Sequence, residues 1–363
     1  MSVATAAEAG HPSPPRETYG YIPALDGFRA LAITVVLAAH FTHSPFVPGG
    51  FGVTLFFFIS GLLITRLLIS EHEATGKVSL PRFYARRFLR LAPALLLMIA
   101  VVTGVTFAVG QKTPIADVLA AVFYVANYYW IFVGFTLTFG VLWSLAVEEH
   151  YYLLYPALLG PLIRTSRPLL ILALLCALAL VWRTILMVFI HPPADYTYMA
   201  TDARFDSILY GALLGVWLHK RPDAAERPLL ASLPSVGLAL VVLVLTFAMK
   251  GALIRETIRY SLQGLALLPI VAAITFSKRN VLFGWARAVL STKPLTFYGK
   301  LSYSIYLWHF PCIFAVTRSL PNLSLSITMP LALLVTFAAA LFSYLAVERT
   351  FLRLRRRFGS HAA

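Results

Sequence analysis

The chain has 363 residues, of which 59% are hydrophobic and only 12% are charged, and its formal net charge is +15. This composition excludes a water-soluble globular protein, because too few polar side chains remain to cover a soluble surface. The chain has only two cysteines, and both lie inside apolar runs, which excludes a disulfide framework and a Cys-x-x-Cys metal site.

Apolar stretches close to the ~20 residues that a bilayer-crossing helix needs recur along the chain. We predict an all-α integral membrane protein with about ten spans, at roughly 24–42, 50–70, 91–110, 140–160, 169–190, 203–218, 229–249, 261–277, 301–318 and 327–348. Residues 116–135 form an eleventh apolar stretch. Its aromatic residues and Asn127 favour an interfacial or re-entrant segment.

Basic residues set the predicted orientation, because Lys and Arg collect in cytoplasmic loops. With the N-terminus inside, the outer segments hold only Lys112, Lys250, Arg255, Arg259 and Arg318. Counting 116–135 as a full span inverts every later loop and removes this bias. We therefore predict that both termini are cytoplasmic. The positive charge then reflects topology and attraction to anionic lipids, and no nucleic-acid partner is needed to explain it.

Three regions follow from this reading. Residues 1–20 are rich in Pro, Ala and Ser and lack an apolar core, so we predict a disordered cytoplasmic tail. Residues 21–349 form one membrane domain, and residues 350–363 form a basic cytoplasmic tail.

The first predicted span, LDGFRALAITVVLAAH over 25–40, carries ionisable residues near both ends. At 100° and 1.5 Å per residue, Arg29 and His40 lie on one stripe about 16 Å apart along the axis, with Asp26 in an arc of about 60°. Ionisable groups in a bilayer cost several kcal/mol, so they indicate function unless a partner satisfies them. Asp26 and Arg29 can form a structural pair, whereas the partner of His40 must come from another helix. A metal at His40 and His43 is an alternative, although no third ligand of suitable spacing is evident.

The second span reads PGGFGVTLFFFISGLLITRLL over 48–68. Its glycines allow close helix packing, and Ser60 can bond across helices. The same small residues can instead leave room for a long, thin ligand.

The connection LPRFYARRFLRLAP over 80–93 holds the densest group of basic residues. If it is helical, Arg82, Arg86 and Arg90 follow one another at four-residue intervals and Arg87 lies three before Arg90, so one basic face points at the cytoplasmic edge of the membrane. Lipid headgroups are one partner for this face. Phosphates of a nucleotide are the other, because the arginine fork binds phosphate in a bidentate manner.

Three later spans also carry polar residues on one face, and we expect these faces to converge on an internal polar cavity. The residues are Ser144, Glu148, Tyr151 and Tyr155 on the fourth span, Arg204 and Asp206 on the sixth, and Ser302, Tyr306 and His309 on the ninth.

Structural roles remain open for several of these residues. Glu148 or Glu149 can pair with an arginine to fix helix packing, and Arg204 can pair with Asp206. His309 can be satisfied by a backbone carbonyl in the turn before Pro311.

These segments, in this order, resemble the acyltransferase-3 family of integral membrane acyltransferases. The resemblance runs from Leu25 to about Glu348 and rests on LDGFRALAI followed by His40, GGFGVTLFFFISGLLIT, RRFLRLAP, LWSLAVEEHYYLLYP, RFD followed by GALLG, and LSYSIYLWH. His150 departs from the glutamine that the family often has there, and we expect it to tune contacts with the acceptor. The chain shows no segment like the soluble esterase-like domain of some members, so we expect no handover of the acyl group within the chain.

The resemblance implies an enzyme of a bacterial inner membrane. Such an enzyme takes an acyl group, usually acetyl, from cytoplasmic acyl-CoA and places it on a hydroxyl of an extracytoplasmic or membrane-linked glycan. It implies no permanently bound cofactor and no metal. Exopolysaccharide, O-antigen or another glycan, and acetyl, succinyl or a longer acyl chain, all stay open, as does the oligomeric state.

The resemblance implies which residues form the site. By position, the family's functional residues correspond to Arg29 and His40 on the first helix, to Arg87 and Arg90 in the Arg-x-x-Arg pair, and to Glu148. The arginines are expected to hold the phosphates of coenzyme A. The ordinary pKa of histidine, about 6.5, suits His40 as general base. Glu148 is expected to orient the His40 imidazole, as the carboxylate does in a catalytic triad. Tyr306 or Ser302 can donate a hydrogen bond to the oxyanion, and an acyl group carried on His40 itself is an alternative chemistry.

Two other classes of protein fit a polar membrane interior. In a multi-pass transporter the polar residues would line a permeation path, but we find no paired Gly or Pro breaks in related halves of the chain. A non-catalytic subunit of a polysaccharide export machine would not need His40 or Glu148.

Overall fold

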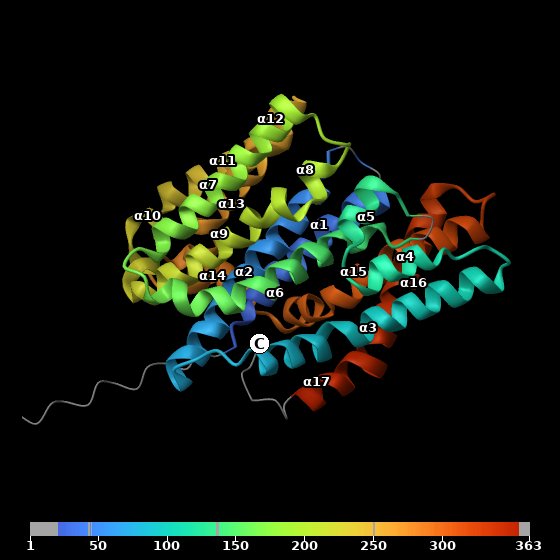
Figure 1. The fold of residues 1–363 in the computed structure, drawn as a ribbon, viewed down its shortest axis with the longest axis horizontal. Helices are drawn as coiled ribbons and strands as arrows, with labels where there is room; N and C mark the ends of the chain where they lie inside the picture. The colour runs from blue at the N-terminus through green and yellow to red at the C-terminus, as the bar shows by residue number, and fades with distance from the viewer. Residues whose placement is uncertain (1–20, 43, 45, 136–137, 250, 356–363) are drawn as a thin grey trace, which may run out of the picture.

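The computed structural model describes residues 21–42, 44, 46–135, 138–249 and 251–355, and within these ranges every regular element is a helix (Figure 1). The predicted tail of residues 1–20 lies outside the described residues. His43, Lys250 and residues 356–363 also lie outside them. Residues 350–355 of the predicted basic tail are helical and continue the last long helix.

A helix lies at each of the ten predicted spans. They are α1 (Pro23–Thr42), α2 (Gly49–Thr75), α3 (Leu80–Ala108), α6 (Trp143–Arg164), α7 (Pro168–Ile185), α9 (Thr201–Lys220), α11 (Leu233–Ala248), α13 (Ile258–Phe276), α15 (Lys293–Ser319) and α16 (Leu325–Ser343). A π-helical turn, Leu186–Ile190, extends α7, and a second, Tyr344–Glu348, joins α16 to α17 (Arg349–Arg355).

Six of the helices in the described part of the chain, counting the extensions of α7 and α16, are long and apolar enough to cross a membrane. The chain is thus a helical, multi-pass membrane protein. A helix can cross lipid because all of its backbone hydrogen bonds are made within the helix itself. The count of ten spans and the cytoplasmic position of both ends stay predictions.

The apolar stretch at 116–135 forms two short helices, α4 (Ile115–Val122) and α5 (Ala126–Phe132). Between them Tyr124 has φ of 56°, a left-handed conformation that interrupts the helix. The buried side chain of Asn127 donates to Met199 O at 3.3 Å and to Thr201 Oγ1 at 2.9 Å, so it faces protein. As predicted, this stretch does not form a spanning helix.

The glycines of α2 serve helix packing, which confirms the first of their two interpretations. A Cβ on Gly61 would lie 2.0 Å from Ile208 O of α9, and a Cβ on Gly211 of α9 would lie 1.8 Å from Phe58 O of α2. Only glycine permits the two backbones to come so close. This tight contact fixes α2 in the centre of the bundle, where it presents its other face to the site described below.

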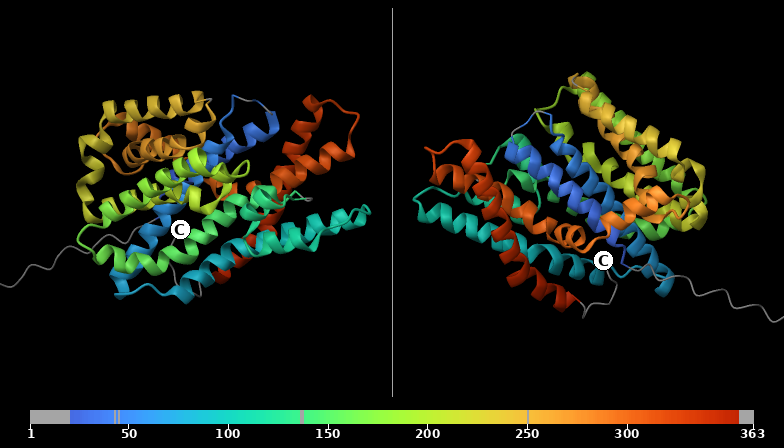
Figure 2. Two further views of the ribbon diagram at one scale, coloured as in Figure 1. Left: turned by 45° about the horizontal axis from the view of Figure 1, so that its top comes forward. Right: turned by 180° about the vertical axis from the view of Figure 1, so that it is seen from behind.

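The two ends of the bundle differ (Figures 1 and 2). One end, called the basic end here, holds the C-terminal ends of α2, α6 and α9 and the first turns of α3. There Arg86 pairs with Glu71 at 2.8 Å, and Lys220 Nζ donates to Ile163 O at 2.9 Å. The opposite end holds the short helices α8 (Tyr196–Met199) and α12 (Ala252–Glu256).

Smaller elements complete the connections. They are the 3-10 turns Gly140–Leu142 and Pro222–Glu226, and the helices α10 (Pro228–Ala231) and α14 (Val281–Leu290). In both figures α3 runs along one side of the bundle, and it packs against α17 and the π-helical turn Tyr344–Glu348. The helices α1, α2, α9, α13 and α15 pack against one another and form the core of the bundle. Helices α3 and α6 cover one side of this core, and the cavity described below lies on that side.

Candidate active site

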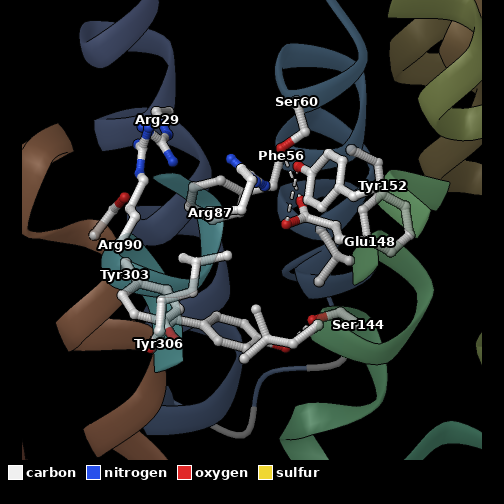
Figure 3. Close-up of a pocket in the computed structure, with 15 residues that line it drawn as sticks. Arg29, Phe56, Ser60, Arg87, Arg90, Ser144, Glu148, Tyr152, Tyr303 and Tyr306 are labelled. Carbon is white, nitrogen blue, oxygen red and sulfur yellow. Dashed lines mark hydrogen bonds between the residues drawn. The ribbon is translucent and has the colours of Figure 1, made fainter. Parts of the chain in front are cut away.

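A cavity of about 50 Å³ lies where α1, α2, α3, α6 and α15 meet (Figure 3). Its polar lining consists of Arg29, Ser60, Arg87, Arg90, Ser144, Glu148, Tyr152, Ser302, Tyr303 and Tyr306. The predicted convergence of polar faces from the first, fourth and ninth spans is therefore confirmed for Arg29, Ser144, Glu148, Ser302 and Tyr306. The other members of those three faces do not line the cavity; they are Asp26, His40, Tyr151, Tyr155 and His309. Tyr152 and Tyr303 were not predicted, although Tyr152 lies one helical turn after Glu148.

The cavity has a charged and ordered interior. In Figure 3, Arg29 and Arg90 lie on one side, Ser60, Glu148 and Tyr152 on the other, and Arg87 between them. Ser60 Oγ donates to Glu148 Oε1 at 2.8 Å, and the Tyr152 hydroxyl makes a long bond of 3.5 Å to Oε2. Three guanidinium groups therefore share the lining with one carboxylate, and an anion is the ligand that this excess of cations favours.

Arg87 is held in a defined position by an aromatic ring. Its guanidinium carbon lies 3.7 Å from the centroid of the Tyr152 ring, a close cation–π contact. Its Nε is buried and has no hydrogen-bond partner among the described residues. A buried donor without a partner costs free energy, so this nitrogen marks a position where a ligand acceptor would be favourable.

The arginines of residues 82–90 do not form the single basic face that was predicted, and their position at the cytoplasmic edge of the membrane stays a prediction. Of the four arginines in this segment, only Arg82 is exposed. Arg86 is buried and pairs with Glu71, whereas Arg87 and Arg90 line the cavity. The reason for the burial of Arg86 is that a buried cation needs a paired anion, and Glu71 near the end of α2 supplies that carboxylate.

A histidine pair lies next to Tyr306. His40 Nδ1 is 3.2 Å from His309 Nε2, and His309 Nδ1 is 2.6 Å from Tyr306 O. Two predictions are thereby confirmed, since the partner of His40 comes from another helix and a backbone carbonyl satisfies His309. Neither histidine lines the cavity, but the Tyr306 ring, which does, has its centroid 5.4 Å from that of His309.

The predicted pairing of Glu148 with His40 does not form. Both hydrogen bonds that Glu148 makes lead to Ser60 and Tyr152. Glu148 lines the cavity beside Arg87 (Figure 3), whereas His40 does not line the cavity and bonds to His309. Glu149, its neighbour in sequence, does not line the cavity, and its Oε1 is buried without a partner among the described residues.

The two hydroxyl groups proposed as oxyanion donors differ in availability. The Tyr306 hydroxyl donates its single proton to Val141 O at 2.8 Å, so Ser144 Oγ, also at 2.8 Å, must donate to the Tyr306 oxygen. Ser302 lines the cavity and makes no hydrogen bond to another described residue. Of these two, Ser302 therefore has the proton to offer a ligand.

Of the two other predicted ion pairs, one forms and one does not. Asp26 lies 3.8 Å from Arg29, which confirms that pair. Asp206 pairs with Arg183 at 2.7 Å and not with Arg204, so that prediction is wrong. Arg204 instead stacks on Tyr260, 3.9 Å from the ring centroid, and neither Arg204 nor Asp206 lines the cavity.

The sequence analysis did not predict a role for Arg183, although an arginine within an apolar span indicates a buried partner. Both Arg183 and Asp206 are fully buried. The guanidinium also donates to Thr257 O, Ala203 O and Ser261 Oγ, so every group of the pair is satisfied. This arrangement joins α7, α9 and α13 and has a structural role.

Comparison with known proteins agrees with this architecture. Residues 22–348 match the family model described as the acyltransferase domain of the acyltransferase-3 type. The chain is 36% identical over 355 residues to the peptidoglycan O-acetyltransferase OatA of Listeria monocytogenes, which covers 90% of this chain and 55% of that protein. It is 36% identical over 313 residues to the O-acetyltransferase OatA of Staphylococcus aureus, with 81% of this chain and 51% of that protein covered.

The chain spans about half the length of the curated relatives that it matches. No solved structure matches it. Since the family model covers nearly the whole described chain and the relatives cover most of its length, the chain belongs to the acyltransferase-3 family.

Proposed function

We propose that the chain transfers an acyl group, in the simplest case acetyl, from acyl-CoA to a hydroxyl of a membrane-linked or extracytoplasmic glycan. The observation that carries the proposal is the arginine-lined cavity inside the bundle, which Tyr306 connects to the His40–His309 pair. The names of the relatives support acetyl as the group. The name of the Listeria relative also makes peptidoglycan the first acceptor class to test.

The donor would bind from the basic end. Arg29, Arg87 and Arg90 offer guanidinium groups to the phosphates of coenzyme A, and the Nε of Arg87 is a donor still to be satisfied. The cavity, at about 50 Å³, is far smaller than the ~300–1,000 Å³ of sites that enclose drug-sized ligands. We therefore place only the phosphates at the arginine-lined cavity and the adenosine outside it. The pantetheine arm with its thioester would extend along Tyr306 toward the His40–His309 pair, with local separation of the helices during entry.

The chemical step would take place next to His40. The acceptor hydroxyl oxygen bonds to the acyl carbon while its proton passes to the His40 imidazole. The carbon–sulfur bond then breaks, and the coenzyme A thiolate takes up that proton. Ser302 is positioned on the cavity lining to donate a hydrogen bond to the carbonyl oxygen as its charge develops.

The structure supports a different role for Glu148 from the one predicted. As a carboxylate among three guanidinium groups, it limits their mutual repulsion, and it holds the Ser60 hydroxyl in place. This is a positioning role on the donor side of the site.

The test is a comparison of two arginine variants on the same helix. The reconstituted full chain is given acetyl-CoA and peptidoglycan fragments, and free thiol and O-acetylated product are measured. We expect Arg87→Ala to weaken acetyl-CoA binding by about tenfold or more, because a charge-assisted hydrogen bond contributes about 1.5–3 kcal/mol. Arg82→Ala, at an exposed position of α3, is the matched control and should change binding by less than about twofold.

Failure of the wild type to bind acetyl-CoA in a direct binding assay would overturn the proposal. Solute flux without consumption of acetyl-CoA would instead indicate a transporter.

A further inference from the structure

His309 makes two hydrogen bonds in series. Its Nδ1 lies 2.6 Å from Tyr306 O in the preceding turn of α15, and its Nε2 lies 3.2 Å from Nδ1 of His40 on α1. The side chain of His309 is fully buried. Both imidazoles also make T-shaped contacts with Phe310, whose ring centroid is 5.8 Å from that of His40 and 6.2 Å from that of His309.

The position of each proton follows from the chemistry of these atoms. A carbonyl oxygen can only accept a hydrogen bond, so Nδ1 of His309 must carry a proton. No described carboxylate lies within ion-pair distance of His309, and a buried, unpaired charge is costly, so His309 is neutral. A neutral imidazole with its proton on Nδ1 has its lone pair on Nε2, which then accepts a hydrogen bond from His40.

We infer that His309 is a positioning residue that holds His40 in the tautomer with the proton on Nδ1. The lone pair of His40 then lies on Nε2, which is the nitrogen that takes the proton from the acceptor hydroxyl. The inference rests on the proposed acyl transfer for its catalytic meaning. It assigns to a buried imidazole, anchored to the backbone of α15, the orienting role that a carboxylate fills in a catalytic triad.

Two substitutions at this position separate positioning from packing. His309→Gln keeps an oxygen that can accept from His40 Nδ1 near the place of the original Nε2. His309→Leu has a similar volume and no acceptor. We expect His309→Leu to lower kcat by about 100-fold or more, because the wrong tautomer of a general base costs up to about 10⁴ in rate.

The other kinetic expectations complete the comparison. His309→Gln should stay within about tenfold of the wild-type kcat. The dissociation constant of acetyl-CoA should change by less than about threefold in both variants, because neither histidine lines the cavity. Equal losses in the Gln and Leu variants, or wild-type turnover in the Leu variant, would overturn the inference.

A second measurement does not depend on activity. Nitrogen-15 NMR of the full chain labelled at histidine reports which ring nitrogen carries the proton, and His40→Ala identifies the His40 signals by their loss. We expect His40 to show a protonated Nδ1 and an unprotonated Nε2, and His309→Leu to shift it toward the other tautomer. A His40 with its proton on Nε2 in the wild type contradicts the inference, even if acyl transfer is never observed.

The two proposals can therefore fail separately. An inactive wild type with the expected His40 tautomer removes the proposed function and leaves the arrangement of protons intact. An active wild type with the opposite tautomer removes the positioning role of His309 and leaves acyl transfer intact.

Discussion

Ser60 of α2 donates a hydrogen bond to Glu148 of α6 at 2.8 Å, and this contact joins two helices beside three arginines. The bond connects a small residue of the packing segment to the only carboxylate that lines the cavity in the described chain. Removing either partner therefore affects both helix packing and the balance of charge.

Glu148→Ala should lower the free energy of unfolding by about 2–4 kcal/mol. It leaves the Ser60 hydroxyl without its acceptor and removes the charge opposed to the arginines. Glu149→Ala is the matched control. One oxygen of Glu149 is already buried without a partner among the described residues, so its loss should cost less than about 1 kcal/mol. Thermal unfolding in one detergent measures both variants, and an equal loss of stability contradicts the role given to Glu148.

Tyr152 should matter for ligand binding through its ring. Tyr152→Phe keeps the ring under the Arg87 guanidinium and loses the hydroxyl with its long 3.5 Å bond to Glu148, so acetyl-CoA should bind within about twofold of wild type. Tyr152→Leu removes the ring, and the dissociation constant should rise by about 3- to 30-fold. Isothermal titration with acetyl-CoA distinguishes the two. Identical constants for Phe and Leu would show that the stacking does not preorganise Arg87.

The helices and several cavity residues could be predicted because each depends on one helix at a time. Apolar length locates a helix in lipid, where every backbone group must be bonded within its own segment. The 100° rotation per residue then places Ser144 and Glu148 on one face of α6, and Ser302 and Tyr306 on one face of α15, and the structure has them on the cavity lining.

Partner choice could not be predicted in the same way, because it depends on how neighbouring helices are rotated and how deep they sit. Asp206 is only two residues from Arg204, yet its partner is Arg183 on α7. His40 lies next to His309 and not next to Glu148 because α15 contacts α1 at that depth. Spacing within one helix contains no information on either relationship.

The Arg183–Asp206 pair should be a major determinant of stability. Arg183→Met leaves a fully buried carboxylate without its cation, and we expect a loss of about 3–5 kcal/mol. The double variant with Asp206→Leu should recover a large part of that loss, because replacing a whole buried ion pair by apolar groups is often close to neutral. A double-mutant cycle in thermal unfolding measures the coupling. Additive losses would contradict the assignment of the pair as a single structural unit.

Two glycines in spanning helices should respond in opposite directions to the same substitution. A Cβ on Gly61 would lie 2.0 Å from a backbone oxygen of α9, which cannot move without separating the helices, whereas a Cβ on Gly104 of α3 meets no atom within 4 Å. Gly61→Ala should therefore destabilise the fold by at least about 1–3 kcal/mol, the usual cost of overpacking. Gly104→Ala should be neutral or stabilise it by up to about 1 kcal/mol, because alanine is the better helix former.

Unfolding temperatures of the two variants in one detergent, with the yield of folded protein, give the comparison. Because α2 carries Ser60 as well as Gly61, separating α2 from α9 also displaces one side of the cavity. Gly61→Ala should therefore weaken acetyl-CoA binding even in the fraction that folds, and Gly104→Ala should not. Equal stability and binding in both variants would mean that α2 and α9 do not touch at Gly61, and the position of α2 in the bundle would have to be revised.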